Sequence, residues 1–121
     1  MTIFHYEVDA DGVATITWDL PGASMNVMNA DGLEQLNAAI DKAHADEAVK
    51  GVILTSAKKD FAGGMDLNIL SQARAQAEAS GGNPAEAMFN MVMDMHGLLR
   101  KIELATLQSR FGRECLRRAR R

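Results

Sequence analysis

The chain has 121 residues, with 47% hydrophobic and 24% charged side chains and a formal net charge of −3. This length predicts one domain, and the composition is ordinary for a soluble globular protein. No apolar run approaches the roughly 20 residues that a membrane-spanning helix needs, and the N-terminus lacks the pattern of a secretory signal. Cys115 is the only cysteine, which excludes an intramolecular disulfide and favours a cytoplasmic location.

The charge is distributed unevenly along the chain. Residues 1–109 carry 15 acidic and 7 basic side chains, whereas residues 110–121 carry 6 arginines and a single acidic residue, Glu114. An arginine-dense tail on an acidic body is compatible with a nucleic-acid-binding arm. Phe111 is the only aromatic residue there that could stack on a base, so nucleic-acid binding is not the favoured interpretation.

The first part of the chain predicts a hairpin followed by a helix. β-branched and aromatic residues populate 2–9 and 12–19, and the Asp-Gly pair between them is a strong hairpin signal. A helix is predicted to begin near Asn29 or Asp31, either of which can cap it, and to end near Asp46. Its apolar face is expected to contain Leu33, Leu36, Ile40 and either Ala39 or Ala43.

The second part predicts one strand and two helices. The apolar run over 51–55 indicates a buried strand, and helices are predicted over about 66–79 and 85–103, with a linker loop at 80–84. An apolar stripe on the last helix is formed by Met88, Val92, Met95, Leu99 and Ile102. The order strand, strand, helix, strand, helix, helix places the chain in the α/β (α+β) class.

The connection between the third strand and the next helix is the most informative segment. It contains the glycine pair Gly63-Gly64, just before the predicted start of the helix. Glycines at such a corner leave backbone N–H groups open to the approach of an anionic oxygen. This geometry is suited to holding a developing oxyanion.

The residues from Phe61 to Leu67 resemble the first oxyanion-hole motif of the crotonase (enoyl-CoA hydratase/isomerase) superfamily, which runs Phe-x-Ala-Gly-x-Asp-Leu/Ile. Residues 19–29 and 98–103 are also similar to family segments. The Pro-Gly-x-Ser-x-Asn form of the former most resembles the hydratase portion of multifunctional fatty-acid-oxidation α subunits, which also carry a 3-hydroxyacyl-CoA dehydrogenase. The resemblance implies that residues 1–103 form the first half of a crotonase-like ββα spiral.

The resemblance also implies a site. The backbone N–H of Gly63 is expected to donate to the thioester oxygen of an acyl-CoA. Asp66 is expected to cap the helix rather than to act as a base. Neither a metal nor a covalently bound cofactor is implied, because the coenzyme A thioester is the substrate. The residues expected to contact substrate or coenzyme A are Asn26, Val27, Met28, Ala62, Gly63, Gly64, Met65, Asp66 and Leu67.

The resemblance ends near residue 103. The family continues with a core strand, a second oxyanion donor and two catalytic glutamates, and residues 104–121 contain no counterpart of them. We therefore expect the chain alone to lack hydratase activity, although it resembles an enzyme of fatty acid β-oxidation. A frameshift or early stop would explain the arginine-rich tail, and a tail for docking to another subunit is the alternative.

A non-catalytic interaction module is the competing hypothesis. In the family, the second half of the fold covers the apolar stripe of the last helix. An uncovered stripe would drive homo-oligomerisation or pairing with other β-oxidation subunits.

Overall fold

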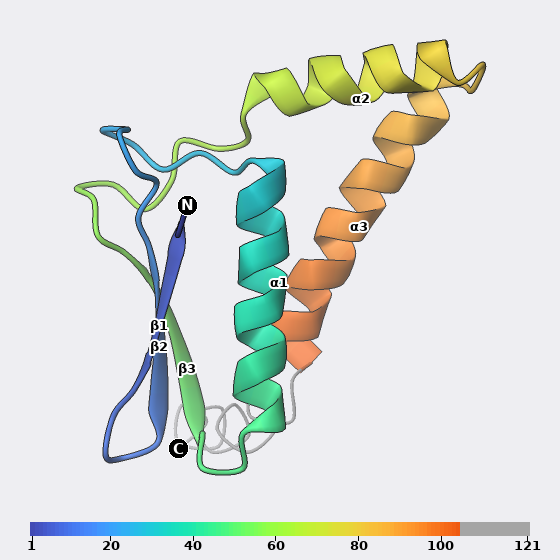
Figure 1. The fold of residues 1–121 in the computed structure, drawn as a ribbon. Coiled ribbons are helices and arrows are strands. Elements are labelled where there is room, and N and C mark those ends of the chain that lie inside the picture. Colours follow the sequence, from blue (N-terminus) through green and yellow to red (C-terminus); the bar gives the residue numbers. More distant parts are fainter. Residues whose placement is uncertain (105–121) are drawn as a thin grey trace, which may run out of the picture.

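The computed structural model describes residues 1–104, so the arginine-rich tail predicted for 104–121 lies almost entirely outside the described part. Three strands and three helices follow one another in the predicted order (Figure 1). The α/β class is confirmed. The elements are β1 (Phe4–Val8), β2 (Val13–Trp18), α1 (Ala30–Ala45), β3 (Gly51–Ser56), α2 (Leu67–Ala79) and α3 (Pro84–Leu104).

The three strands form one sheet in the order β1-β2-β3. The predicted hairpin is confirmed: β1 and β2 are antiparallel, and Asp9 Oδ1 accepts hydrogen bonds from the amides of Asp11 and Val13, both at 2.9 Å. β3 runs parallel to β2 and places Ser56 opposite Trp18. Parallel neighbours need a crossover connection, and α1 provides it.

α1 covers one face of the sheet and completes the core. Asn29 is its N-cap, because its side chain accepts a hydrogen bond from the amide of Gly32 at 2.7 Å. Alternate residues of β2 and one face of α1 are buried together. This follows because side chains repeat every two residues on one face of a strand and about every 3.6 residues on one face of a helix. The side chains buried between these two elements include Ala14, Ile16, Trp18, Leu36, Ile40 and Ala43.

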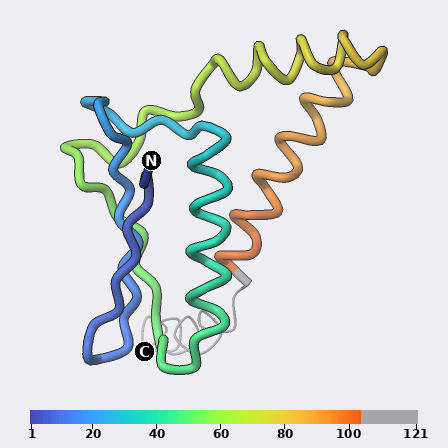
Figure 2. Tube along the Cα trace, viewed as in Figure 1, coloured from blue at the N-terminus to red at the C-terminus, as the bar shows by residue number. Residues whose placement is uncertain are grey.

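α2 and α3 form a helical hairpin that extends away from the sheet (Figures 1 and 2). Only the C-terminal part of α3 returns to α1, where Leu98 and Ile102 join the core. The Lys101 ammonium lies 2.9 Å from Asn37 Oδ1 and is paired with the Asp41 carboxylate. α3 is therefore attached to the body at one end.

This arrangement decides two sequence predictions, the apolar stripe on α3 and the buried strand over 51–55. The stripe expected on α3 is uncovered in part: Val92 and Leu99 are exposed, whereas Met88, Met95 and Ile102 are half-buried. The one buried apolar side chain on the described part of α3 is Leu98, with 9% exposure, which the stripe did not include. β3 is not a buried strand, because Ile53 is 52% exposed and the strand pairs with β2 alone in the described part of the chain.

Candidate functional site

The candidate site is the corner that leads from β3 into α2, residues 61–67. At this corner Met65 forms an isolated parallel bridge with Met28. The Met28 amide donates to the Gly64 carbonyl at 2.8 Å, and the Asp66 amide donates to the Met28 carbonyl at 2.8 Å. The corner is thus held against the segment that precedes α1.

A bulge interrupts this short ladder just before the bridge. The regular parallel pattern would direct the Gly64 amide to the Asn26 carbonyl, but the Gly63 amide donates there instead, at 2.7 Å. The φ angle of Gly64 is 106°, a conformation that side chains rarely adopt. The second glycine of the pair therefore accommodates the extra residue in the ladder.

The hydrogen bond to Asn26 corrects the expected role of Gly63. The family resemblance implied that this N–H donates to the thioester oxygen of a substrate. In the structure the same N–H is used by the Asn26 carbonyl, so it is not available to a ligand in this conformation. The physical reason is the bulge, which the sequence pattern does not reveal.

The Met65 amide has the orientation that was expected of Gly63. In a paired strand, successive residues direct their polar backbone groups alternately toward the partner and away from it. The Gly64 C=O and the Asp66 N–H point toward the Met28 segment. The Met65 N–H, which lies between them in the chain, therefore points to the opposite side. No acceptor within residues 1–104 takes a hydrogen bond from this amide.

Asp66 has the capping role that the sequence predicts. It is the N-cap of α2, and its Oδ1 accepts a hydrogen bond from the Asn68 amide at 2.9 Å. Leu67 follows at the first position of the helix with 75% of its surface exposed. A leucine so exposed is available for contact with an apolar group.

The other expected contact residues divide by exposure. Ala62 and Gly64 are exposed, whereas Val27 and Met28 are half-buried and pack against the core. Asn26 is 0% exposed, and its side-chain amide is hydrogen-bonded to protein groups on every side. The Asn26 side chain therefore cannot touch coenzyme A in this structure, which corrects its predicted role.

The nearby lysines are not equivalent. Lys58 Nζ lies 2.7 Å from Asp19 Oδ1, and this hydrogen bond from the ammonium lowers the pKa of the Asp19 carboxyl. Lys59 is exposed and forms no ion pair among the described residues. Of the two, Lys59 is therefore the one free to meet an anionic group.

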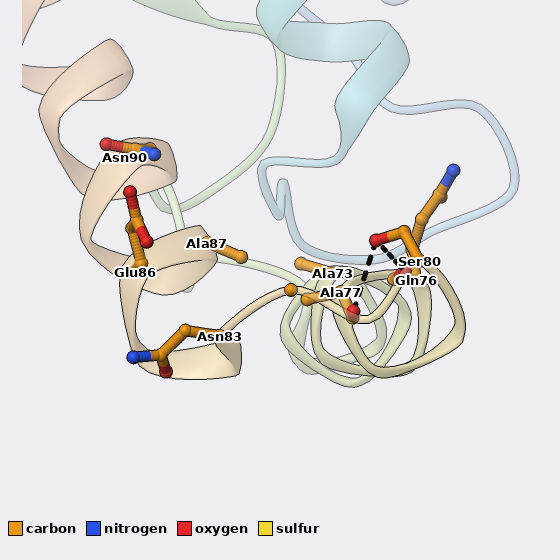
Figure 3. A pocket seen from close by; sticks show the side chains of 9 residues that line it. Ala73, Gln76, Ala77, Ser80, Asn83, Glu86, Ala87 and Asn90 are labelled. Atoms are coloured by element: carbon orange, nitrogen blue, oxygen red, sulfur yellow. Dashed lines mark hydrogen bonds between the residues drawn. The ribbon is translucent and has the colours of Figure 1, made fainter.

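A pocket of about 380 Å³ lies elsewhere, inside the hairpin of α2 and α3 (Figure 3). Two of its polar side chains bond the local backbone: the Ser80 hydroxyl donates to the carbonyls of Gln76 and Ala77, and Asn83 Oδ1 accepts from the Ala85 amide. None of the expected site residues lines this pocket. The corner, which is an open surface, has the stronger chemical case.

Two negative findings apply to residues 1–104. No cluster of His, Cys, Asp or Glu side chains in this range could hold a metal ion. None of the three helices combines the length and the apolar character that a membrane span requires.

The fold and its corner define a class of protein. The described part of the chain is a parallel βαβ unit preceded by a hairpin, and this arrangement is similar to solved structures of the enoyl-CoA hydratase/isomerase type. Similar solved structures include proteins of the enoyl-CoA hydratase/isomerase type from Mycobacterium abscessus (TM-score 0.67, 29% identity) and Xanthobacter autotrophicus Py2 (TM-score 0.65, 30% identity). The chain is covered to 84% and 86% in these comparisons.

The family assignment follows from the sequence match. The family model described as enoyl-CoA hydratase/isomerase matches residues 9–99, and the chain belongs to this family. It is also 33% identical over 95 residues to the fatty acid oxidation complex subunit alpha of Idiomarina loihiensis, a match that covers 77% of this chain. The chain spans only 13% of that relative and 36% and 35% of the two solved structures.

Sequence reasoning missed the role of Ser56. Its hydroxyl accepts hydrogen bonds from Asn26 Nδ2 at 2.9 Å and from the Lys58 amide at 3.0 Å, and it donates to the Asp60 carbonyl at 2.9 Å. A serine at the end of a strand often binds the following turn. Its bond to Asn26, a residue distant in sequence, had no signal in the sequence.

Proposed function

We propose that residues 61–67 bind an acyl-CoA thioester and that the Met65 N–H polarises its carbonyl oxygen. The observation that carries this proposal is the direction of the Met65 amide, away from the Met28 segment and without an internal acceptor among the described residues. A backbone donor fixed before the oxygen arrives stabilises developing negative charge without reorganisation, and one such donor can be worth about 3 kcal/mol of barrier. Family membership supports an acyl-CoA as the substrate class.

The neighbouring residues suit the rest of such a ligand. Leu67 offers an exposed apolar surface for the acyl or pantetheine chain, and Lys59 offers an unpaired ammonium within the described part for a phosphate. Ala62, Gly64 and the half-buried Val27 and Met28 remain proposed contacts. No metal or other cofactor enters this chemistry.

The test uses 4-(dimethylamino)cinnamoyl-CoA, whose absorption moves to longer wavelength when its carbonyl accepts strong hydrogen bonds. Wild-type chain should bind it and shift its absorption to the red. Met65→Pro removes the N–H without breaking a hydrogen bond of the described chain and should abolish the shift. Met65→Leu keeps the N–H and is the matched control. Binding by the wild type without a red shift would refute the proposal.

We also propose that this chain alone does not hydrate crotonyl-CoA. One polarising donor is in place at the corner, but no general acid or base that resembles the family's glutamate pair lies in the sequence. Hydration well above the background rate, measured with the purified chain, would show that other residues supply the acid and base. The red shift and the absence of turnover are therefore separate expectations.

A second candidate function, self-association, is favoured by one observation. Four large apolar side chains are exposed on one side of α3, here termed the outer face: Phe89, Val92, Met93 and Leu99, with exposures of 62%, 41%, 49% and 54%. Large apolar side chains exposed together on one side of a helix favour an interaction site. We propose that it mediates homo-oligomerisation or contact with another β-oxidation subunit.

Light scattering tests the second candidate. The wild type should be larger than a monomer, and the double variant Phe89→Lys/Met93→Lys should dissociate to a monomer. Arg74→Lys, on the exposed surface of α2, serves as the charge-neutral control. A wild type that is monomeric at all concentrations would remove this candidate and leave the acyl-CoA site untouched.

A further inference from the structure

Asn26 is the most thoroughly hydrogen-bonded side chain near the corner. It is completely buried, at 0% exposure, and it is the only buried polar residue within the described chain. Its Oδ1 accepts a hydrogen bond from the Leu20 amide at 2.9 Å. Its Nδ2 donates to the Trp18 carbonyl at 3.0 Å, to Ser56 Oγ at 2.9 Å and to the Phe61 carbonyl at 3.3 Å.

The orientation of this amide is fixed by its partners. The Leu20 N–H can only donate, so it must face Oδ1. The carbonyls of Trp18 and Phe61 can only accept, so they must face the NH₂ group. A flipped amide would lose these bonds and bring its oxygen against two carbonyl oxygens.

Asn26 also holds the chain at two points just before the proposed donor, the Met65 N–H. The Asn26 side chain holds the Phe61 carbonyl, and the Asn26 main-chain carbonyl holds the Gly63 amide at 2.7 Å. Ala62 lies between these two anchors, and Met65 follows two residues after the second. Through Ser56 the side chain also holds the end of β3, where the segment leading to the corner begins.

We infer that Asn26 is a positioning residue for the thioester site: its buried side chain fixes residues 61–63 and thereby aims the Met65 amide. This inference rests on the proposed function. Asn26 touches no substrate, because it has no exposed surface. It acts by holding three segments that are far apart in sequence in one arrangement, and a displacement of about 1 Å in such a donor can cost about a hundredfold in rate.

The experiment compares red shift with affinity for 4-(dimethylamino)cinnamoyl-CoA in three variants. Asn26→Ala should lose at least half of the wild-type red shift, while the Kd changes by about threefold or less, because the coenzyme contacts lie outside the buried side chain. Asn26→Asp should behave like Asn26→Ala, since a carboxylate keeps the acceptor but lacks the NH₂ donors. Asn29→Ala is the matched control: it removes a hydrogen bond of similar length from the cap of α1 and should keep the full shift.

Ser56→Ala keeps the inference testable if Asn26→Ala does not fold. It removes one partner of the Asn26 amide and should reduce the red shift without abolishing binding. A full red shift in folded Asn26→Ala, or in Ser56→Ala where only that variant folds, would overturn the inference while leaving the proposed function intact. A wild type without any shift would overturn both, so the two failures are distinguishable.

Discussion

Substitution by alanine should affect stability differently at the two adjacent glycines of the corner. At Gly63 the added methyl group lacks space, whereas at Gly64 the backbone conformation is unsuited to a side chain. At Gly63 an added Cβ would lie 2.4 Å from the Met25 sulfur and 3.1 Å from Met25 Cγ. The backbone of Gly63 does not have a positive φ, so alanine fits its conformation. At Gly64 a Cβ would meet nothing within 4 Å, but the φ angle is 106°.

The magnitudes follow from these geometries. A comfortable contact needs about 3.5–4.0 Å, so the Met25 sulfur must retreat by more than about 1 Å. Met25 is 43% exposed and unbranched, and moving it costs about 0.5–1.5 kcal/mol at most. Alanine also stabilises the folded state by about 0.4–1 kcal/mol, because it restricts the conformations of the unfolded chain. The two effects largely cancel, so Gly63→Ala should change the free energy of unfolding by less than about 1 kcal/mol. Gly64→Ala should cost about 1–2 kcal/mol, since its strain cannot relax.

Urea denaturation with linear extrapolation measures both values. The double variant Met25→Ala/Gly63→Ala should be more stable than the two single changes predict, because the contact at 2.4 Å is no longer present. If Gly63→Ala were the more damaging of the two glycine substitutions, the reasoning from backbone conformation would be refuted.

Three further predictions concern the body of the fold. Leu98→Ala should lower the free energy of unfolding by about 2–4 kcal/mol, because Leu98 is only 9% exposed. The neighbouring Leu99→Ala should lower it by less than about 1 kcal/mol, because Leu99 is 54% exposed. Equal losses in urea denaturation would contradict this orientation of α3. Lys101→Met removes the contacts of the ammonium with Asp41 and Asn37, so it should lower the free energy of unfolding by about 1 kcal/mol and weaken its dependence on salt concentration. A salt dependence equal to that of the wild type would contradict this prediction. Because Lys58 lowers the pKa of Asp19, their pairing stabilises the fold above the ordinary carboxyl pKa of about 4 and is lost as the pH falls through the lowered value, so Asp19→Asn should flatten the acid limb of a pH–stability curve.

Local features of this chain were predictable because their causes are local. The Asn29 and Asp66 caps each bond an amide two or three residues ahead, and the signal is in the sequence itself. The hairpin follows from its Asp-Gly turn in the same way. These local signals correctly predicted the hairpin and the starts of α1 and α2.

The site was less predictable because its hydrogen bonds join distant segments. Gly63 has suitable chemistry for an oxyanion donor, yet its amide is taken by the Asn26 carbonyl, a partner that only the folded chain brings near. The burial of Leu98 was unpredictable for a related reason: helical periodicity gives the spacing of apolar residues, but the residue that reaches the core depends on where α3 meets α1.

The outer edge of β3 has a consequence for the handling of this chain. Within residues 1–104 the strand pairs only with β2, so the N–H and C=O groups along its other side have no strand beside them. Such an edge is a template on which an extended segment, including one from another copy, can add itself by main-chain bonding alone. Any association that returns when the α3 double variant is highly concentrated is therefore expected to proceed through this edge and not through the outer face of α3.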